Sequence, residues 1–425
     1  MEPILDGVMH AATATKSAEA LRALANRYSQ DIPPRPSPLR HRAQGGKDVI
    51  LVTGTTGNFG CDLLEALLTD DGVELVYALN RGGSNALERQ KAAFHSRELD
   101  ADLLESPKFR MVEGDISRPD FGLQPELLDE IRNSVTVLVH NAWQVNFNLP
   151  IASFDLFLRS LRYLADFALS SPYIELPKIQ YVSSITVFQS CDVPVPVEEE
   201  PVGAGSALGS GYGESKWVGE QMLLNLRERT GLPVQLVRLA QICGDRNGYW
   251  NAAEWFPAMV KSAFLTRCLP DIDGDAAFVP NYAAARALVE MRSSPEAVLH
   301  LTHPRSVRLR TLLSSTADEL GIPLVSWDRY LQVLARCVKD VGSESTKEEY
   351  VEAVRRNPSL ILLGFFCTRK FEQGNEMTHF VALSTEKAQA ASPTLQHLPE
   401  LGDDVALSWL SAWRAAGFLD AEGQF

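Results

Sequence analysis

The sequence has few of the features that would place a protein in a membrane or on a nucleic acid. Its longest apolar runs are too short to cross a bilayer. Basic residues number 40 and acidic residues 54, and the resulting net charge of −14 argues against a nucleic-acid surface. The six cysteines include no C-x-x-C pair, which indicates reduced thiols and neither a zinc site nor a disulfide framework. We therefore expect an intracellular protein that holds no metal.

The N-terminus shows no apolar core of a signal peptide, because the acidic Glu2 and Asp6 fall within it. We expect a cytoplasmic location on this ground. Hydrophobic residues make up 45% of the chain and charged residues 22%, close to an average soluble protein. A length of 425 residues allows two or more domains, and no internal repeat or low-complexity tract is present.

One stretch organises the rest of the chain. An apolar run at 49–52 is followed by the pattern Thr-Gly-x-x-Gly-x-x-Gly at 53–60 and by a helical pattern at 61–68. Between a buried parallel strand and a helix, the first glycine permits a sharp turn and the second lets the backbone approach a pyrophosphate. The third lets the helix pack closely. The helix N-terminus offers unpaired N–H groups to the phosphates, whereas an ordinary glycine turn is the alternative. The predicted contacts are Gly54, Thr56, Gly57, Asn58, Phe59 and Gly60.

From residue 48 onward, strand-like and helical patterns alternate. This rhythm predicts βαβ units and an α/β fold, namely a Rossmann-type doubly wound parallel sheet. A smaller, mainly helical C-terminal region should bind the substrate. The predicted strands are 48–53, 73–79, 109–112, 135–140, 178–184, 233–239 and 297–302.

Residues at the ends of the next three predicted strands indicate which dinucleotide binds. Arg81 ends the second strand, where an acidic residue would bind a free ribose 2′-hydroxyl and an arginine suits a 2′-phosphate. Arg89 adds positive charge on the following helix. Asp115 and Ile116 follow the third strand, where an aspartate can meet the adenine amino group, and Asn141 ends the fourth strand beside the cofactor. The sequence thus favours NADPH over NADH, with Arg81 as a plain surface cation the alternative.

The chemistry is predicted in two later segments. Ser184 closes a strand, and Tyr212 and Lys216 share one face of a helix because they are four residues apart. An ammonium group at Lys216 can lower the phenol pKa and hold the nicotinamide ribose, so that Tyr212 becomes a proton donor. Ser184 can hydrogen-bond the same substrate oxygen. His140 is more typical of a packed structural histidine than of a catalyst.

These motifs are joined by longer segments that resemble one family. Residues 48–425 resemble an extended short-chain dehydrogenase/reductase. Within that superfamily they are most similar to the terminal thioester-reductase domain of carboxylic acid reductases and of fungal adenylate-forming reductases related to non-ribosomal peptide synthetases. The segments that carry this resemblance are 78–81, 88–94, 140–148, 303–305, 392–395 and the closing helix at 409–419.

The resemblance implies a function. An upstream adenylation domain activates a carboxylic acid, and a phosphopantetheinylated carrier domain holds it as a thioester. The reductase then delivers hydride from NADPH and releases an aldehyde, with Tyr212 protonating or polarising the oxygen, Lys216 binding ribose and Ser184 orienting the carbonyl. Leu239, Gln241 and Ile242 should lie beside the nicotinamide. The resemblance implies an aryl or polyketide-type acid, and the sequence does not fix which one.

The same resemblance divides the chain. Residues 1–47 are expected to be a leader that follows the carrier, with one amphipathic helix at 17–29 and an extended proline-rich piece at 32–38; a disordered tail is the alternative. The predicted NADP-binding domain is 48–245 plus about 278–305, and the substrate and carrier domain is 246–277 plus 306–425. The aromatic residues of 246–277 serve as substrate contacts or as core.

Two positions depart from the family pattern. Phe157 stands where extended reductases often carry an asparagine that feeds a proton relay, and Asn281 and Tyr282 replace the valine and aspartate of a common Pro-Val-Asp motif. Three other functions stay open: a free-standing acyl-CoA or carbonyl reductase, a nucleotide-sugar epimerase, and a non-catalytic NADP-sensing regulator. The regulators typically lose the tyrosine that Tyr212 supplies here.

Overall fold

The chain folds into two compact units. The computed structural model describes residues 17–42, 45–83, 85–191, 195–341, 346–367 and 381–419. The first unit comprises Met1–Ala240, Tyr282–Thr302 and Leu383–His397; the second comprises Gln241–Asn281, His303–Ala382 and Leu398–Phe425. The predicted assignment of cofactor and substrate binding to separate regions stays a prediction.

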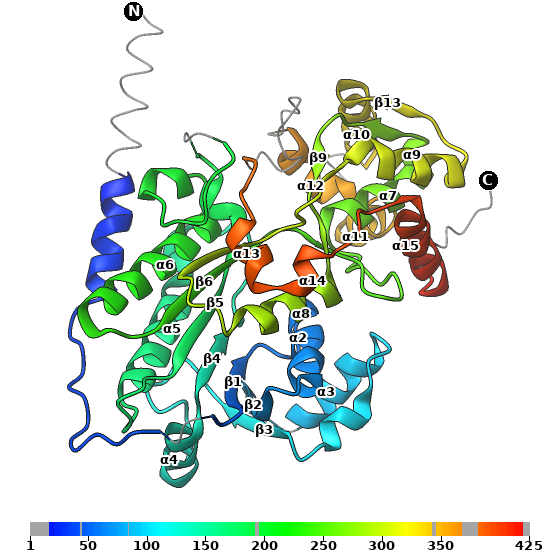
Figure 1. Ribbon diagram of the computed structural model, residues 1–425. Coiled ribbons are helices and arrows are strands. Elements are labelled where there is room, and N and C mark those ends of the chain that lie inside the picture. The colour runs from blue at the N-terminus through cyan, green and yellow to red at the C-terminus, as the bar shows by residue number, and fades with distance from the viewer. Residues whose placement is uncertain are drawn as a thin grey trace, which may run out of the picture. The chain divides into compact units, whose positions relative to one another are not determined.

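The first unit is built on a seven-stranded parallel sheet in the order β11-β6-β5-β4-β1-β2-β3 (Figure 1). The chain runs outward from β1 to β3 and then returns to place β4 on the other side of β1. Ligands of such sheets bind at this reversal, outside the carboxyl ends of the strands. All seven predicted strands and the doubly wound fold are confirmed. The strands are β1 (Asp48–Thr53), β2 (Val73–Arg81), β3 (Phe109–Gly114), β4 (Val137–His140), β5 (Lys178–Ser184), β6 (Val234–Leu239) and β11 (Val298–Leu301).

Helices follow the strands of the first unit as predicted. The helical pattern after the glycine turn belongs to α2, and the helix that carries Tyr212 and Lys216 is α6. The α6 helix begins where the Ser210 side chain accepts a hydrogen bond from Gly213 N, and it ends at Gly231, whose φ of +73° suits glycine. The helices are α2 (Asn58–Thr69), α3 (Ala86–His95), α4 (Pro125–Ser134), α5 (Asp155–Leu169), α6 (Gly211–Thr230), α8 (Asn281–Met291), α13 (Glu386–Ala391) and α14 (Pro393–Gln396), with 3₁₀ turns η1 (Ala101–Glu105), η2 (Ile151–Phe154), η3 (Ile185–Phe188) and η4 (Ala204–Ala207).

The described part of the leader packs on the first unit. Residues 17–28 are helical and bury one stripe, and the backbone around Tyr28 accepts hydrogen bonds from Arg162 of α5. After the proline-rich piece, the guanidinium carbons of Arg40 and Arg42 lie 5.0 and 4.3 Å from the centroid of the Tyr173 ring. Residues 17–42 therefore form a strap on this unit and not a disordered tail. A tether to an upstream domain stays a prediction.

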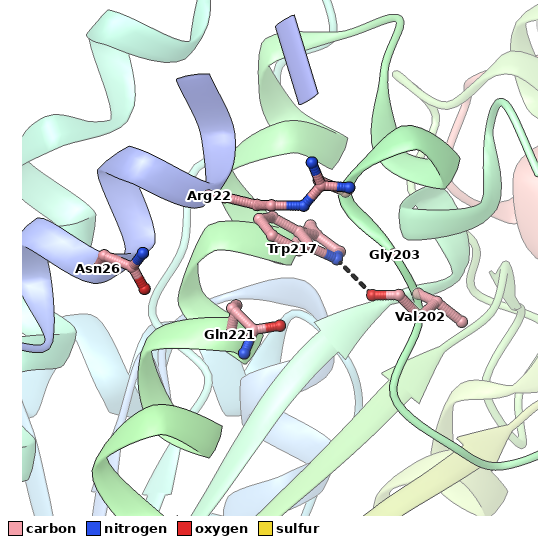
Figure 2. A pocket seen from close by; sticks show the side chains of 7 residues that line it. Arg22, Asn26, Val202, Gly203, Trp217 and Gln221 are labelled. Carbon is pink, nitrogen blue, oxygen red and sulfur yellow. Dashed lines mark hydrogen bonds between the residues drawn. The ribbon is translucent and has the colours of Figure 1, made fainter. Parts of the chain in front are cut away.

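The helical part of the strap lines one side of a pocket against α6. The pocket has a volume of about 250 Å³. Trp217 Nε1 donates a hydrogen bond over 2.8 Å to the Val202 carbonyl, and Figure 2 marks this bond with a dashed line. The pocket lies on the side of α6 that carries Trp217 and Gln221, away from the stripe that carries Tyr212 and Lys216. The lining residues are Arg22, Asn26, Val202, Gly203, Ala204, Trp217 and Gln221.

The second unit is mainly helical, as predicted. Its core includes Trp250, Phe256 and Met259, so these aromatic and sulfur-containing side chains of 246–277 serve as core and not as exposed substrate contacts. Residues 347–356 form the charged helix α11. The predicted closing helix begins and ends earlier than expected, because α15 is followed by a turn in which Gly417 has φ +67°. The elements are β7 (Ile242–Cys243), α7 (Trp255–Thr266), β8 (Leu269–Asp271), β9 (Asp275–Ala276), β10 (Val279–Pro280), β12 (Val307–Arg308), α9 (Leu309–Leu320), β13 (Leu324–Ser326), α10 (Trp327–Val341), α11 (Lys347–Arg356), α12 (Ser359–Cys367) and α15 (Asp403–Ala415).

The described residues lack a membrane-spanning helix and a metal-binding cluster. Within those ranges, no helix has the length and apolarity needed to span a bilayer. The same residues contain no group of three or more histidine, cysteine, aspartate or glutamate side chains that could hold a metal ion.

Candidate active site

The glycine turn has room for backbone only. Gly54 has φ +77°, and a Cβ on it would lie 2.9 Å from Ala142 Cα. A Cβ on Gly60 would lie 1.9 Å from Gly54 O and 2.9 Å from Thr55 Cα, distances that backbone atoms cannot relieve by a rotamer change. The first glycine is thus required by its positive φ and the close approach of Ala142, and the third by the packing of α2 against the turn.

The N-terminus of α2 fits a phosphate group. Gly57 is the N-cap and makes no side-chain capping bond, and the first turn carries no acidic residue. Unpaired N–H groups at such an end favour an anion. Thr56 is exposed and Phe59 is buried, while Asn58 Oδ1 accepts a hydrogen bond from Arg97 Nη1 over 2.6 Å. The structure therefore offers a cradle for the pyrophosphate of a dinucleotide, and the contacts of individual residues stay predictions.

A group of buried side chains supports this turn. Thr55 Oγ1 donates to Gln90 Oε1 over 2.7 Å, and Gln90 Nε2 donates to the Thr55 carbonyl over 3.0 Å. Asn80 Nδ2 donates to Thr55 Oγ1 over 2.7 Å, and Asn141 Nδ2 donates to Gly54 O over 3.2 Å. The ends of β2 and β4 and helix α3 are thereby tied to one turn. Thr55, Asn80 and Gln90 were not predicted, because their only signal in the sequence is polarity at otherwise apolar positions.

The residues predicted to meet the adenosine lie at the carboxyl ends of β2 and β3. Arg81 and Arg89 are exposed, and Arg89 Nη2 donates a hydrogen bond to the Arg81 carbonyl over 2.6 Å. The Asp115 carboxylate accepts hydrogen bonds from the hydroxyl and the backbone N–H of Ser117, and these bonds lower the pKa of Asp115. Ile116 follows and is half-buried. The Arg81 guanidinium has the exposure that recognition of a phosphate requires.

The three predicted catalytic residues come together in the first unit. Tyr212 lies in the first turn of α6, is 6% exposed, and its hydroxyl interacts with Ser184 at the end of β5. Ser184 Oγ also accepts a hydrogen bond from Thr186 N over 3.2 Å. One turn further along α6, Lys216 Nζ donates to the Val182 carbonyl over 2.7 Å. The hydroxyls of Ser184 and Tyr212 and the ammonium group of Lys216 therefore lie together at the carboxyl end of β5.

Burial dominates the protonation of this group. It raises the pKa of Tyr212 to about 12, and the hydrogen bond with Ser184 lowers that pKa only in part. Burial also holds the pKa of Lys216 well below its usual range, and the nearby charge of Glu220 acts in the opposite direction. The sequence predicted a lowered phenol pKa, whereas the pKa of Tyr212 is raised. Tyr212 is consequently protonated at neutral pH and available as a donor.

Aromatic rings surround the lysine. Lys216 Nζ lies 4.4 Å from the ring centroid of Trp143 and 4.8 Å from that of Tyr181. The ring of Phe157, at the position of the relay asparagine, lies 5.5 Å from Trp143. His140 is fully buried, its Nδ1 lies 2.9 Å from Thr53 Oγ1, and burial lowers its pKa to about 3. His140 is thus a neutral structural residue, as the sequence indicated.

One side chain that packs against Tyr212 was not predicted. Phe147 is 47% exposed, although its ring centroid lies only 5.1 Å from that of Tyr212 in an edge-on arrangement. Val145 in the same segment is 65% exposed. An exposed aromatic ring against a buried catalytic side chain offers an apolar contact for a bound acyl group.

The predicted nicotinamide contacts are divided between the units. Leu239 ends β6 in the first unit, whereas Gln241 and Ile242 belong to the second. Gln241 Nε2 donates hydrogen bonds to the Ile242 carbonyl and to Glu254 Oε2, both over 2.7 Å. Asn281 is buried at the start of α8. This helix forms despite the departure from Pro-Val-Asp.

Comparison with known proteins identifies a family. Residues 52–288 match the family model NAD_binding_4, described as male sterility protein. This match covers more than half of the chain and includes the glycine turn and the three candidate catalytic residues.

Curated relatives carry reductase names. The chain is 37% identical over 416 residues to the adenylate-forming reductase Nps10 of Heterobasidion annosum, with 95% of this chain and 38% of the relative covered. It is 35% identical over 414 residues to Nps11 of Serpula lacrymans, covering 92% of this chain and 37% of the relative. A carboxylic acid reductase of Neurospora crassa is 29% identical, with 92% and 37% covered. The chain thus spans less than two fifths of these relatives, and the predicted family resemblance is confirmed.

Solved structures share the fold. The terminal R domain of the myxalamid PKS-NRPS pathway superposes with a TM-score of 0.77 at 24% identity, covering 96% of this chain and 100% of that chain. The R domain of a non-ribosomal peptide synthetase from Mycobacterium tuberculosis gives 0.65 at 20% identity, covering 95% and 99%. At these identities the likeness shows the fold.

Proposed function

The chain belongs to the NAD-binding family described as male sterility protein, and on this premise we propose that it is an NADPH-dependent thioester reductase. The family and the fold make it an oxidoreductase with a nicotinamide cofactor. The proposed substrate is an acyl group held as a thioester on a phosphopantetheinylated carrier domain, and the product is an aldehyde. The observation that supports this most directly is the contact of Ser184 and Tyr212 above Lys216, in a unit that also contains the glycine cradle.

Each side chain of the site has its own role in the proposed reaction. Bound NADPH supplies a hydride to the thioester carbonyl carbon. Tyr212 donates its phenolic proton to the carbonyl oxygen as negative charge develops there, and Ser184 hydrogen-bonds the same oxygen. Lys216 holds the ribose and stabilises the resulting phenolate. When the carbon–sulfur bond of the hemithioacetal breaks, the phenolate takes back the hydroxyl proton, and the thiolate is protonated from solvent.

The proposed partners follow from the relatives. Their names include adenylate-forming reductases, and one similar solved structure is a thiolation-reductase di-domain. We infer a carrier domain and an upstream adenylation domain as partners, with the strap of residues 17–42 leading toward them. Phe147 beside Tyr212 favours an aryl or other planar acyl group.

The test is NADPH oxidation with an aryl thioester of a pantetheine analogue, with NADH in a parallel assay and extraction of the product. We expect turnover with NADPH and an aldehyde in the extract. Turnover of free aldehydes or ketones without turnover of thioesters would identify a carbonyl reductase. A lack of turnover on every carbonyl, with cofactor binding intact, would favour the NADP-sensing regulator.

The cofactor preference rests on Arg81. Replacing Arg81 with alanine should raise the KM for NADPH about 10- to 100-fold and change that for NADH less than about 2-fold, because only NADPH carries the 2′-phosphate. Steady-state kinetics with both cofactors measure this. Arg110→Ala is a matched control, since Arg110 is a half-exposed arginine on β3 that pairs with Glu130. An equal rise in the KM for both cofactors would mean that Arg81 does not recognise the 2′-phosphate.

A further inference from the structure

A buried carboxylate lies one helical turn beyond Lys216. Glu220 is 2% exposed, and its Oε1 accepts a hydrogen bond from Ser183 Oγ over 2.5 Å. Arg238, which is fully buried on β6, donates from Nε to Oε1 over 3.0 Å and from Nη2 to Oε2 over 2.8 Å. Every oxygen of this carboxylate is engaged, so its position is fixed.

Hydrogen bonds of Glu220 and its neighbours on α6 hold this helix against β5. Tyr212, Lys216 and Glu220 are spaced by four residues and form one stripe of the helix. They meet three consecutive residues of the strand: Tyr212 interacts with Ser184, Lys216 donates to the Val182 carbonyl, and Glu220 accepts from Ser183. A shift of the helix by one residue would break all three contacts together. The contacts of Tyr212, Lys216 and Glu220 therefore depend on the same alignment of α6 with β5.

Behind Glu220 the network continues through neutral and charged groups. Arg238 Nη1 lies 3.2 Å from His300 Nε2, and His300 Nδ1 lies 2.8 Å from the Ser384 carbonyl. Because a carbonyl only accepts, Nδ1 carries the proton and Nε2 accepts from Arg238. Arg238 Nη1 also donates to the Glu200 carbonyl over 2.9 Å. The guanidinium is thus held from both sides and presents its charge to Glu220.

The charges around Lys216 give Glu220 a second effect. The groups that face the ammonium are the rings of Tyr212, Tyr181 and Trp143, together with the Val182 carbonyl. Both tyrosines are neutral at ordinary pH, since burial raises the pKa of each, and His140 of β4 is neutral as well. Burial opposes the charged form of Lys216, and the Glu220 carboxylate is what favours it.

We propose that Glu220 is a positioning residue for the reaction: its carboxylate fixes the register of α6 on β5 and keeps Lys216 as an ammonium ion. This inference rests on the proposed function for its catalytic meaning. Its test uses cofactor binding, which reports on Lys216 whether or not thioesters are the substrate.

The experiment is a fluorescence titration of the whole chain with NADPH, and in parallel with NADH, across neutral and alkaline pH. Affinity should fall where Lys216 loses its proton, because the neutral amine holds the ribose less well. In Glu220→Gln this fall should move to lower pH by about one unit, and kcat should decrease about ten-fold. Glu228→Gln, an exposed glutamate on the same helix, should match the wild type.

Two further variants separate positioning from charge. Ser183→Ala removes the link to the strand and leaves the ion pair, so kcat should fall several-fold with no change in the pH of the binding transition. If Glu220→Gln does not fold, Glu220→Gln with Arg238→Met removes both buried charges together, which proteins often tolerate; the transition should still move to lower pH. A folded Glu220 variant whose transition and kcat match the wild type would overturn the inference. Failure of wild-type thioester reduction with the pH shift intact would instead refute only the proposed function.

Discussion

Tyr212→Phe is expected to reduce kcat about 10²- to 10⁴-fold while NADPH affinity stays within about 2-fold of wild type. The substitution removes the proposed proton donor to the substrate oxygen and leaves the ring packed against Phe147 and Phe154. The phenol is 6% exposed and its pKa is raised to about 12, so water replaces it poorly as a donor. Stopped-flow NADPH oxidation and a fluorescence titration of cofactor binding measure the two quantities.

Tyr77→Phe is the matched control for this result. Tyr77 lies in the middle of β2, and its hydroxyl donates to Glu130 Oε1 of α4 over 2.7 Å. Loss of this hydroxyl should leave kcat unchanged. A Tyr212→Phe variant that retains most of its turnover would mean that another group donates the proton. Normal cofactor binding with no turnover in either the variant or the wild type would point instead to the NADP-sensing regulator.

Local features of the sequence predicted what is local in the structure. The glycine spacing predicted the turn, because the conflict between Gly60 and Gly54 arises within seven residues. The four-residue spacing of Tyr212 and Lys216 predicted a shared helix face. The alternation of apolar and helical patterns predicted all seven strands, since strands buried on both faces need continuous apolar runs.

Features that depend on distant partners were not predictable. Gln90 supports Thr55 from 35 residues away, and Arg238 reaches Glu220 from a neighbouring strand. The sequence predicted that Lys216 would lower the pKa of Tyr212, but burial of the tyrosine raises that pKa. Burial is a property of the assembled fold, and no spacing rule reports it. The strap of residues 17–42 likewise depends on distant partners, since it contacts Tyr173 and Arg162.

Gly60→Ala is expected to lower the stability of the first unit by about 3 kcal/mol and to weaken NADPH binding more than about ten-fold. The added methyl group would lie 1.9 Å from Gly54 O and 2.9 Å from Thr55 Cα, so either α2 or the turn must move. Moving the turn also disturbs the hydrogen bond between Asn141 and Gly54. Urea unfolding followed by circular dichroism and a cofactor titration measure both effects.

Gly205→Ala provides the comparison that isolates this conflict. A Cβ on Gly205 would meet no atom within 4 Å, and Gly205 lies in η4 of the same unit, so the change should alter stability by less than about 0.5 kcal/mol. If Gly60→Ala were as stable as Gly205→Ala and bound NADPH normally, the turn would be able to accommodate the added methyl group. That result would contradict the conflict inferred from the packing. If the variant were stable but failed to bind, the third glycine would serve the pyrophosphate directly. Loss of both stability and NADPH binding, in contrast, would show that cofactor binding depends on the close packing of α2 on the turn. The helix end that faces the phosphates is positioned only when that packing is intact.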